Sequence, residues 1–389
     1  MDRDKFTAAA TGTLVRIESP VRDWSFIPHD MPPAWQFPNE LWPYLADARE
    51  AMAMLDGIGR TLPDPNLLLR PLQSREAITS SNIEGTLVTP ELLLLYEIDP
   101  QEARSTQDKR ADYMEVHNYR LALEEGRKMI DSGVRLGSDF IKSIHNVLMR
   151  GARGRDKTPG EFRTRHVHIG SNLRFIPPPH GEIPRLMENF SRYISSPPEP
   201  GIHPITKACI AHCQFEAIHP FADGNGRVGR ALFSLMLYKS LRHSQPWLYL
   251  SAYLDRYKDQ YIQNMFRVST HGDWSNWIEF CLRGVVVQSK DAIKRCELFR
   301  QLQKKYADMV SSPTARTQKI LDGLFSEPVL TIPALAARFH TTYHTARKDI
   351  RALVDAGILT EMNDITPKAF CAAELLRIAH SPGIEDIEL

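Results

Sequence analysis

The sequence predicts a mainly helical protein with a short β-hairpin near its middle and a winged helix at its C-terminal end. Apolar residues recur three and four positions apart through most of the chain, which is the spacing of amphipathic helices. The stretch 160–184 interrupts this spacing with β-branched and aromatic residues on both sides of a Gly-Ser-Asn turn. Beyond residue 313, the pattern indicates a helix, a helix-turn-helix and a wing. The expected parts are an N-terminal segment at 1–105, a catalytic domain at 106–305 and a winged helix-turn-helix domain at 312–389.

Length and composition place the chain among ordinary soluble proteins. Its 389 residues are enough for two or three domains, and 42% are hydrophobic and 24% charged. The formal net charge of +1 provides no general attraction to nucleic acid or acidic membranes. The first residues lack the apolar core of a signal peptide, and no later run reaches membrane-spanning length. None of the five cysteines forms a CxxC pair, and we expect Cys209 and Cys213 to be buried free thiols of a cytoplasmic protein.

The N-terminal segment begins with a region rich in proline and tryptophan. Residues 1–75 are expected to form an extended arm followed by a helix at 41–59. The short polar stretch ITSSNIEG then precedes helices at 109–130 and 138–151, the second with Ser138 as its N-cap.

The middle of the chain contains the predicted hairpin. Gly170, Ser171 and Asn172 form its turn, and the prolines at 177–179 end its second strand. Helical spacing resumes in four stretches, which are 205–221, 229–241, 255–269 and 274–306.

The segment HPFADGNGRVGR, residues 219–230, combines residue types that suit phosphate binding. Gly224 and Gly226 allow the backbone to approach a ligand closely and to turn its N–H groups inward. A helix begins directly after them, so its positive end faces the same point. Arg227 and Arg230 lie three apart on the first turn of that helix, where both can reach phosphate oxygens.

Two further residues of this segment add chemistry to the anion site. Asp223 offers the hard oxygen ligand that Mg²⁺ bound to phosphates prefers. His219 ends the preceding helix and can take a proton from a hydroxyl near neutral pH. Each of these residues alone is more typical of a structural role, but their occurrence within twelve positions favours nucleotidyl or phosphoryl transfer to a hydroxyl.

The segment resembles the signature of the Fic family, HPFx(D/E)GNGRxxR, at every fixed position. The similarity extends roughly over residues 70–290 and includes FEAIHPF and GEFRTRHVHIG. It implies a helical Fic core that transfers AMP from ATP to a Ser, Thr or Tyr hydroxyl and releases pyrophosphate. The resemblance implies these roles: His219 as the base, Asp223 as the Mg²⁺ ligand, Gly224, Asn225 and Gly226 as the anion hole, Arg227 as a phosphate ligand and Arg230 as the γ-phosphate ligand.

A second short motif, SSNIEG at residues 80–85, resembles the inhibitory helix motif (S/T)xxxE(G/N) of the same family. Glu84 can pair with Arg230 and thereby remove the side chain that would hold the γ-phosphate. Ser80 and Gly85 are expected to bound the short helix that presents Glu84. Some relatives use this glutamate to position a water that removes AMP, so the reverse hydrolysis remains a second expected activity.

Two further expectations concern the target and the base of the nucleotide. By resemblance, the hairpin at 167–176 is a flap that holds the target protein by strand addition beside His219. Tyr257 and Tyr261 lie four apart on one helical face, and Tyr261 is the candidate contact to adenine, with core packing as the alternative. The loop histidines near the flap are expected to be solvated rather than to bind a metal.

The C-terminal domain could bind DNA or protein. Its second helix carries Tyr343, His344, Arg347, Lys348 and Arg351, a plausible face for the major groove or phosphates. From residue 311 onward, however, eight Lys and Arg face ten Asp and Glu, which argues against strong nonspecific DNA binding.

The sequence therefore predicts a self-inhibited protein adenylyltransferase that uses MgATP and acts on a target protein or on itself. Family resemblance also implies a homodimer. Two alternatives remain, namely a DNA-binding regulator whose Fic core senses a nucleotide and a Fic enzyme that uses another nucleotide donor.

Overall fold

A computed structural model describes residues 1–389 except 19–21, 104, 106, 152–156, 171–174, 311–313, 364–367 and 383–389. The elements up to residue 195 are η1 (Arg3–Lys5), β1 (Gly12–Ile17), β2 (Asp23–Pro28), η2 (Asn39–Leu41), α1 (Trp42–Arg60), α2 (Asn66–Ile83), α3 (Pro90–Ile98), α4 (Lys109–Asp131), α5 (Ser138–Leu148), η4 (His180–Glu182) and α6 (Ile183–Ser195). They are followed by α7 (Pro204–Ile218), α8 (Asn225–Leu241), α9 (Ser251–Arg256), α10 (Lys258–His271), α11 (Trp274–Met309), α12 (Ala315–Gly323), β3 (Val329–Thr331), α13 (Ile332–Arg338), α14 (Tyr343–Asp355), β4 (Thr360–Glu361), β5 (Ala369–Cys371) and α15 (Ala373–His380).

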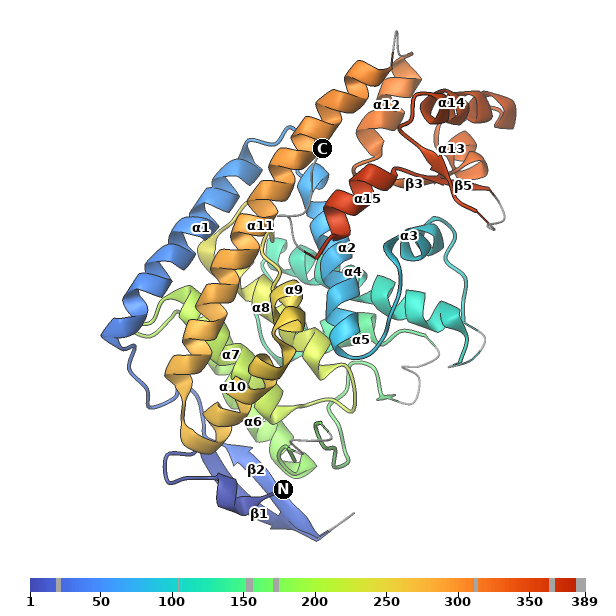
Figure 1. Cartoon of the computed structure of the whole chain (residues 1–389). Helices are drawn as coiled ribbons and strands as arrows, with labels where there is room; N and C mark the ends of the chain where they lie inside the picture. Colours follow the sequence, from blue (N-terminus) through green and yellow to red (C-terminus); the bar gives the residue numbers. More distant parts are fainter. Residues whose placement is uncertain are drawn as a thin grey trace.

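The mainly helical fold predicted from the sequence is confirmed. Helices α7 and α8 pack against each other at the centre, with α4 and α5 against α8. The 36-residue α11 runs along α1 and extends to the C-terminal domain (Figure 1). The predicted boundary at residue 305 falls inside this helix, because apolar side chains as far as Tyr306 are buried along it. Among the described residues, no helix is both long enough and apolar enough to cross a membrane.

The N-terminal arm is a β-hairpin rather than a single extended segment. β1 and β2 pair antiparallel from Gly12 opposite Pro28 to Ile17 opposite Asp23. The prolines and tryptophans around this region obscured the alternation that two short strands require. The N–H of Phe26 in β2 donates to the carbonyl of Ile176 at 2.9 Å, so the hairpin holds the last residue of the predicted flap.

The predicted flap at 167–176 is described only in part. Ile169 and Phe175 form an isolated antiparallel bridge, and residues 171–174, which include most of the predicted Gly-Ser-Asn turn, lie outside the described part of the chain. The bridge agrees with the antiparallel pairing that the predicted hairpin requires at these two residues.

The C-terminal part is the predicted helix-turn-helix with a small antiparallel sheet in the order β3-β5-β4. Most of its buried side chains join the same hydrophobic cluster as those of the helical core, through residues such as Phe299 of α11 and Phe325, and a second small cluster surrounds the sheet. Helix α15 returns to the core and lies against α2, α3 and α11 (Figure 1). The winged-helix module is thus packed onto the helices that surround the candidate site.

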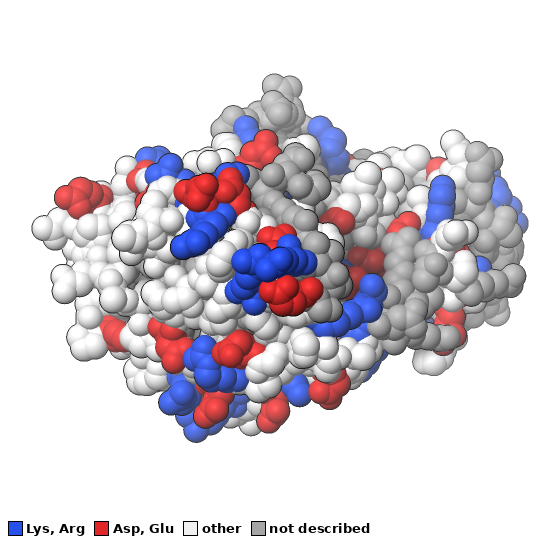
Figure 2. All heavy atoms as spheres, turned by 90° about the horizontal axis from the view of Figure 1, so that it is seen from below, with Lys and Arg blue, Asp and Glu red and all other residues white. Residues whose placement is uncertain are grey.

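Charge on the molecule is mixed, as the near-neutral composition leads one to expect. Figure 2 shows the face seen from below, where Lys and Arg alternate with Asp and Glu over short distances. Five cysteines, including Cys209 and Cys213, are buried and free, which confirms the expectation for that pair.

Candidate active site

The candidate site is built on the loop that joins α7 to α8. α7 ends at Ile218, and His219 follows in the left-handed region with φ of 50°. Gly224 precedes α8 with φ of 75°, a conformation that glycine adopts without steric cost. The Asn225 side chain accepts a hydrogen bond from the Phe221 N–H at 2.8 Å and donates to its carbonyl at 2.9 Å. These bonds close the turn, so the N-terminal amides of α8 are fixed in position.

His145 of α5 packs against this loop and has a structural role. Its ring stacks on Phe221 with a centroid distance of 3.7 Å, and its Nε2 lies 3.1 Å from the carbonyl oxygen of Asp223. Its Nδ1 accepts a hydrogen bond from Gly160 at 2.9 Å. Burial lowers the pKa of His145 to about 4, which keeps the ring neutral and suited to this packing.

Arg163 fixes the backbone at His219, and sequence reasoning assigned it no role. Its Nε donates to the His219 carbonyl at 2.8 Å, and its Nη2 donates to the Pro178 carbonyl at 2.6 Å. Arg163 therefore joins the end of α7 to the chain after the flap. The sequence could not reveal this role, because the two carbonyls that Arg163 binds lie far from it along the chain. The one local feature at Arg163 is the stretch GEFR, where the helical spacing ends.

The His219 ring is mostly buried and neutral. Burial lowers its pKa to about 4, and the positive charge of Arg163 adds to this shift, while Glu84, Glu216 and Asp223 oppose it. Its Nδ1 lies 3.9 Å from Oε2 of Glu216. At neutral pH the imidazole therefore holds a free lone pair and can accept a proton.

Asp223 and Arg227 lie on the same side of the loop. The Asp223 Oδ1 accepts a hydrogen bond from Gly224 N–H at 2.6 Å and lies 3.6 Å from Nη2 of Arg227. Arg227 also forms a close ion pair with Glu115 of α4. The Asp223 side chain is 46% exposed, so its carboxylate is accessible to a cation.

The chemistry of this donor set fits Mg²⁺. Among the described residues, no group of three or more His, Cys, Asp or Glu could hold a metal by itself. Mg²⁺ bound to a nucleotide commonly has one or two carboxylate ligands, with phosphates and waters as the others. A single accessible carboxylate beside an anion site meets this requirement.

Helix α2 closes the other side of the site. Arg230 of α8 donates from Nη2 to Oε1 of Glu84 at 2.8 Å and to the Ser80 carbonyl at 2.9 Å, and from Nε to the Ser80 Oγ at 2.8 Å. The Arg230 side chain is only 3% exposed. The motif that implied a pairing of Glu84 with Arg230 is therefore matched by this geometry.

Electrostatics holds both members of this pair charged. Burial raises the pKa of Glu84, but the charge and hydrogen bond of Arg230 outweigh it and leave the pKa below its ordinary value. Burial alone would lower the pKa of Arg230, yet Glu84 raises it above the usual range. The Arg230 guanidinium is thus paired with the Glu84 carboxylate.

The expectation that Ser80 begins a short helix is wrong. Ser80 lies near the end of the 18-residue α2, because leucines from Leu67 onward extend the buried face of this helix well upstream. Its hydroxyl binds Arg230 instead of capping a helix. Gly85 follows Glu84 with φ of 93°, as expected for the residue where the helix stops.

Gly226 allows α2 to approach the loop this closely. A Cβ at this position would collide with Oε1 of Glu84 and would lie within 3 Å of Arg230. The glycine predicted to admit phosphate therefore also admits the Glu84 carboxylate.

Tyr261 lies in the core and not on a surface open to a nucleotide. It is 3% exposed, and its hydroxyl lies 2.8 Å from Nε2 of His212. Its ring packs near Trp277, with centroids 6.0 Å apart. The position of Tyr261 on the inner face of α10 thus agrees with the core-packing alternative. Tyr257, by contrast, is exposed.

Glu216 is a buried carboxyl in this cluster that the sequence reasoning did not single out. Burial raises its pKa to about 8, with Arg230 opposing the shift and Glu84 adding to it. Near neutral pH, much of this carboxyl is therefore protonated.

We predict that Glu216→Gln makes the protein more stable at higher pH relative to the wild type. Between pH about 4.5 and 8, the folded state retains a proton at Glu216 that the unfolded chain has lost. The free energy of unfolding therefore falls as pH rises through this window, by at most about 1.4 kcal/mol per pH unit, and Glu216→Gln removes that slope.

Urea unfolding at three pH values within the window measures the difference between the two proteins. Glu188→Gln, at an exposed position, serves as the control and should follow the wild-type curve. A constant difference between Glu216→Gln and the wild type would show that Glu216 is ionised throughout.

Three family models match this chain. The Fic/DOC family matches residues 135–237, the Fic/DOC family N-terminal domain matches 42–128, and a DeoR-like helix-turn-helix domain matches 316–362. Proteins named protein adenylyltransferase Fic are similar, with 33% identity over 163 residues in Drosophila sechellia and 30% over 182 residues in Aedes aegypti. These matches cover 41% and 46% of this chain, and the chain spans about a third of the relatives, 31% and 34% of their lengths.

A solved structure has the same fold. A Fic family protein from Desulfovibrio desulfuricans superposes with a TM-score of 0.57 at 20% identity, over 88% of this chain and 98% of the other. This likeness supports the fold over most of the chain.

Proposed function

Because this chain carries a Fic/DOC domain, preceded by that family's N-terminal domain and followed by a DeoR-like helix-turn-helix, we propose that it is a protein adenylyltransferase. It transfers AMP from ATP to a Ser, Thr or Tyr hydroxyl of a target protein or of itself. The observation that carries the proposal is the loop 219–230, where a neutral histidine, an accessible carboxylate and the start of α8 meet. The adenylyltransferase name of the similar insect proteins supports the choice of reaction.

In this proposal the residues of the loop have separate roles in binding the phosphates and the metal. The N–H groups at Gly224, Asn225 and Gly226 and the guanidinium of Arg227 hold the phosphates. Mg²⁺, held by Asp223, supplies charge neutralisation at the phosphates when bound.

His219 acts on the hydroxyl of the target. It takes the hydroxyl proton while the hydroxyl oxygen attacks the α-phosphorus. The bond from the α-phosphorus to the oxygen that bridges to the β-phosphate then breaks, and pyrophosphate leaves. Arg230 would bind the γ-phosphate and hold the leaving group in line.

Self-inhibition is part of the proposal. Arg230 cannot bind a γ-phosphate while its donors are directed at Glu84 and Ser80. We propose that Glu84 leaves Arg230 before productive ATP binding, and that a water beside Glu84 allows AMP removal as a second activity.

The target is proposed to lie along residues 167–176, where Ile169 and Phe175 already bridge. Backbone pairing there would place a hydroxyl near His219, because Arg163 holds both the His219 carbonyl and the chain after the flap. A homodimer and a cytoplasmic location belong to the same proposal, and the five free cysteines suit a reducing compartment.

ATP labelled at different phosphates tests the reaction. With Glu84→Gly protein, label from the α-phosphate should appear on protein and label from the γ-phosphate should not. Transfer of γ-label alone would indicate a kinase, and competition by UTP or GTP would reveal another donor. Absence of transfer with every donor would favour a nucleotide-sensing regulator.

DNA binding is a second candidate function, favoured by α14. Tyr343, Arg347, Lys348 and Arg351 are all exposed on this helix, and it lies within the match to the DeoR-like domain. Fluorescence anisotropy with labelled duplexes over a range of salt concentrations tests it, because phosphate contacts give a strong salt dependence. A salt-independent signal, or none, would indicate protein docking instead.

A further inference from the structure

The winged-helix module touches the inhibitory helix directly. Helix α15, at the end of the module, lies against α2, whose last residue directly precedes Glu84, and against α11 (Figure 1). Arg75 and Glu84 are nine positions apart along the chain, or about 14 Å at the rise of an α-helix. A contact at Arg75 can therefore influence the position of Glu84 through one rigid element.

Two buried arginines hold the end of α15. Arg295 of α11 donates to the carbonyl of Ile378 in a close hydrogen bond and to that of Ser381 at 2.9 Å. Arg75 of α2 donates to the carbonyl of Pro382 at 3.5 Å, a longer contact. Carbonyls at and beyond the C-terminal end of a helix carry partial negative charge and suit such cations.

Asp291 joins the two arginines. Its carboxylate lies 2.7 Å from Nη1 of Arg75 and 2.7 Å from Nε of Arg295. One carboxylate thus pairs with both guanidinium groups, and carbonyls at and just beyond the end of α15 accept further donors from them. Arg295 is fully buried, so withdrawal of α15 would leave part of its hydrogen-bonding capacity unsatisfied unless water or a moved helix replaced it.

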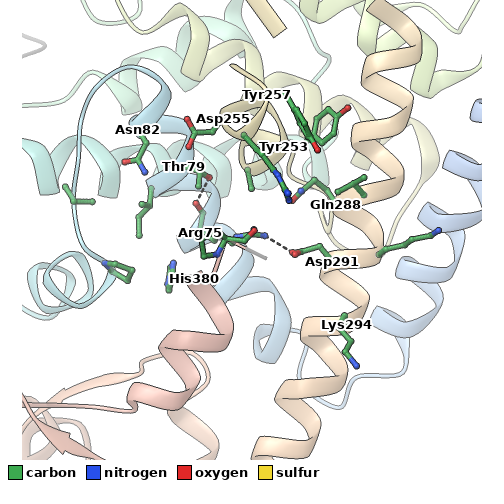
Figure 3. A pocket seen from close by; sticks show the side chains of 18 residues that line it. Arg75, Thr79, Asn82, Tyr253, Asp255, Tyr257, Gln288, Asp291, Lys294 and His380 are labelled. Atoms are coloured by element: carbon green, nitrogen blue, oxygen red, sulfur yellow. Dashed lines mark hydrogen bonds and ion pairs between the residues drawn. The ribbon is translucent and has the colours of Figure 1, made fainter. Parts of the chain in front are cut away.

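A cavity of about 1050 Å³ lies beside α2 at this contact. Figure 3 shows Arg75, Thr79 and Asn82 of α2 at the cavity, with Asp291 of α11 on one side and His380 of α15 on another. These α2 residues share one face of the helix, spaced four and three apart, while Ser80 and Glu84 point from a different face toward Arg230. The cavity thus offers space into which α2 can move away from Arg230.

We propose that the docked winged-helix module is a brake on the active site. Docked α15 braces α2, and this keeps Glu84 on Arg230. When α15 leaves Arg295 and Arg75, α2 shifts toward the cavity and Arg230 becomes available to a γ-phosphate. The predicted effect on AMP transfer rests on the proposed function. The predicted loosening of α2 does not depend on it.

The coupling is reciprocal. A ligand that releases Glu84 from Arg230 must also weaken the docking of α15, and a partner that binds the undocked module must favour the active state. Coupling energies of about 1–3 kcal/mol correspond to about 5–150-fold changes in rate or affinity.

Arg295→Met in the full-length protein tests the brake. It removes the donors to α15 and leaves Arg75 paired with Asp291. Arg283→Met is the matched control, since Arg283 also lies on α11 and pairs with an acid four residues earlier, Glu279, but at an exposed site. We expect faster amide hydrogen exchange at 80–83 in Arg295→Met, and unchanged exchange there in the control.

The rate of AMP transfer provides the second readout. Arg295→Met should raise it by about 5–150-fold, and should raise it no further when Glu84→Gly is already present. Lys305→Met, which removes an exposed ion pair of 2.9 Å between α11 and Glu374 of α15, should give a smaller rise of the same kind without endangering the fold.

The outcomes separate the brake from the proposed activity. Unchanged exchange at 80–83 in a folded Arg295→Met protein would overturn the brake. If Arg295→Met does not fold, unchanged exchange and rate in Lys305→Met would overturn it. Faster exchange without AMP transfer in any variant would support the brake and reject the proposed reaction.

Discussion

Glu84→Gly is expected to raise the rate of AMP transfer by about 30- to 150-fold over the wild type. This range corresponds to about 2–3 kcal/mol, between the small value of exposed ion pairs and the 3–5 kcal/mol lost on breaking a buried pair. The intermediate value is appropriate because Arg230 is buried while the Glu84 side chain is 39% exposed. The substitution frees the guanidinium for the γ-phosphate and leaves the loop 219–230 intact.

A glycine at this position should be tolerated by the backbone. Glu84 lies just beyond the last residue of α2, so a glycine there is outside the helix and the helix itself loses little. Transfer of α-labelled phosphate to protein, with wild type and Glu84→Gly compared at equal ATP, measures the effect. Glu84→Gln, which retains an acceptor but no charge, should lie between them, and equal rates in all three would reject inhibition by Glu84.

The melting temperature of Glu84→Gly should depend on MgATP more strongly than that of the wild type. Without ATP, Glu84→Gly leaves the Arg230 guanidinium buried without its carboxylate, which should lower the melting temperature. MgATP should restore more stability to this variant than to the wild type, because a ligand stabilises the state that binds it.

His219→Ala, made in the Glu84→Gly protein, is expected to reduce AMP transfer by about 10²–10⁴-fold. This is the range that a positioned general base contributes. The pKa of about 4 leaves the imidazole neutral at pH 7, so the base is ready without prior loss of a proton. Affinity for ATP should remain nearly unchanged, since the proposed phosphate ligands come from α8.

Two measurements separate loss of the base from loss of the fold. ATP affinity can be followed by calorimetry, and transfer by α-label on the target. His344→Ala, at an exposed position on α14, is the control and should transfer AMP at the parental rate. Activity of His219→Ala within tenfold of the parent would mean that another group accepts the proton.

The sequence predicted the helices and the loop because both depend on local patterns. Apolar spacing located α4 at Lys109–Asp131 almost to the residue, and the glycines and arginines at 224–230 are adjacent in the chain. The pairing of Glu84 with Arg230 spans 146 positions and was inferred only through a resemblance.

Long-range contacts account for what the sequence did not reveal. Arg75 and Asp291 are 216 positions apart, and no local pattern indicates that they meet. Arg163 acts on the carbonyl of His219 across 56 positions. The length of α2 was missed because its sequence mixes leucines with buried polar residues such as Gln73 and Glu76, which blurs the amphipathic pattern.

The close fit of Glu84 against Gly226 limits how the proposed regulation can evolve. The backbone that must remain bare to receive a phosphate in the proposed reaction is the same backbone that contacts the Glu84 carboxylate. If Glu84 inhibits as proposed, a side chain at 226 that expelled it would also obstruct the nucleotide, so natural selection has no route to a permanently active form through that position. Heritable changes in the ease of activation would instead arise in α2 or in the helices packed against it, where they leave the residues of the loop 219–230 unchanged.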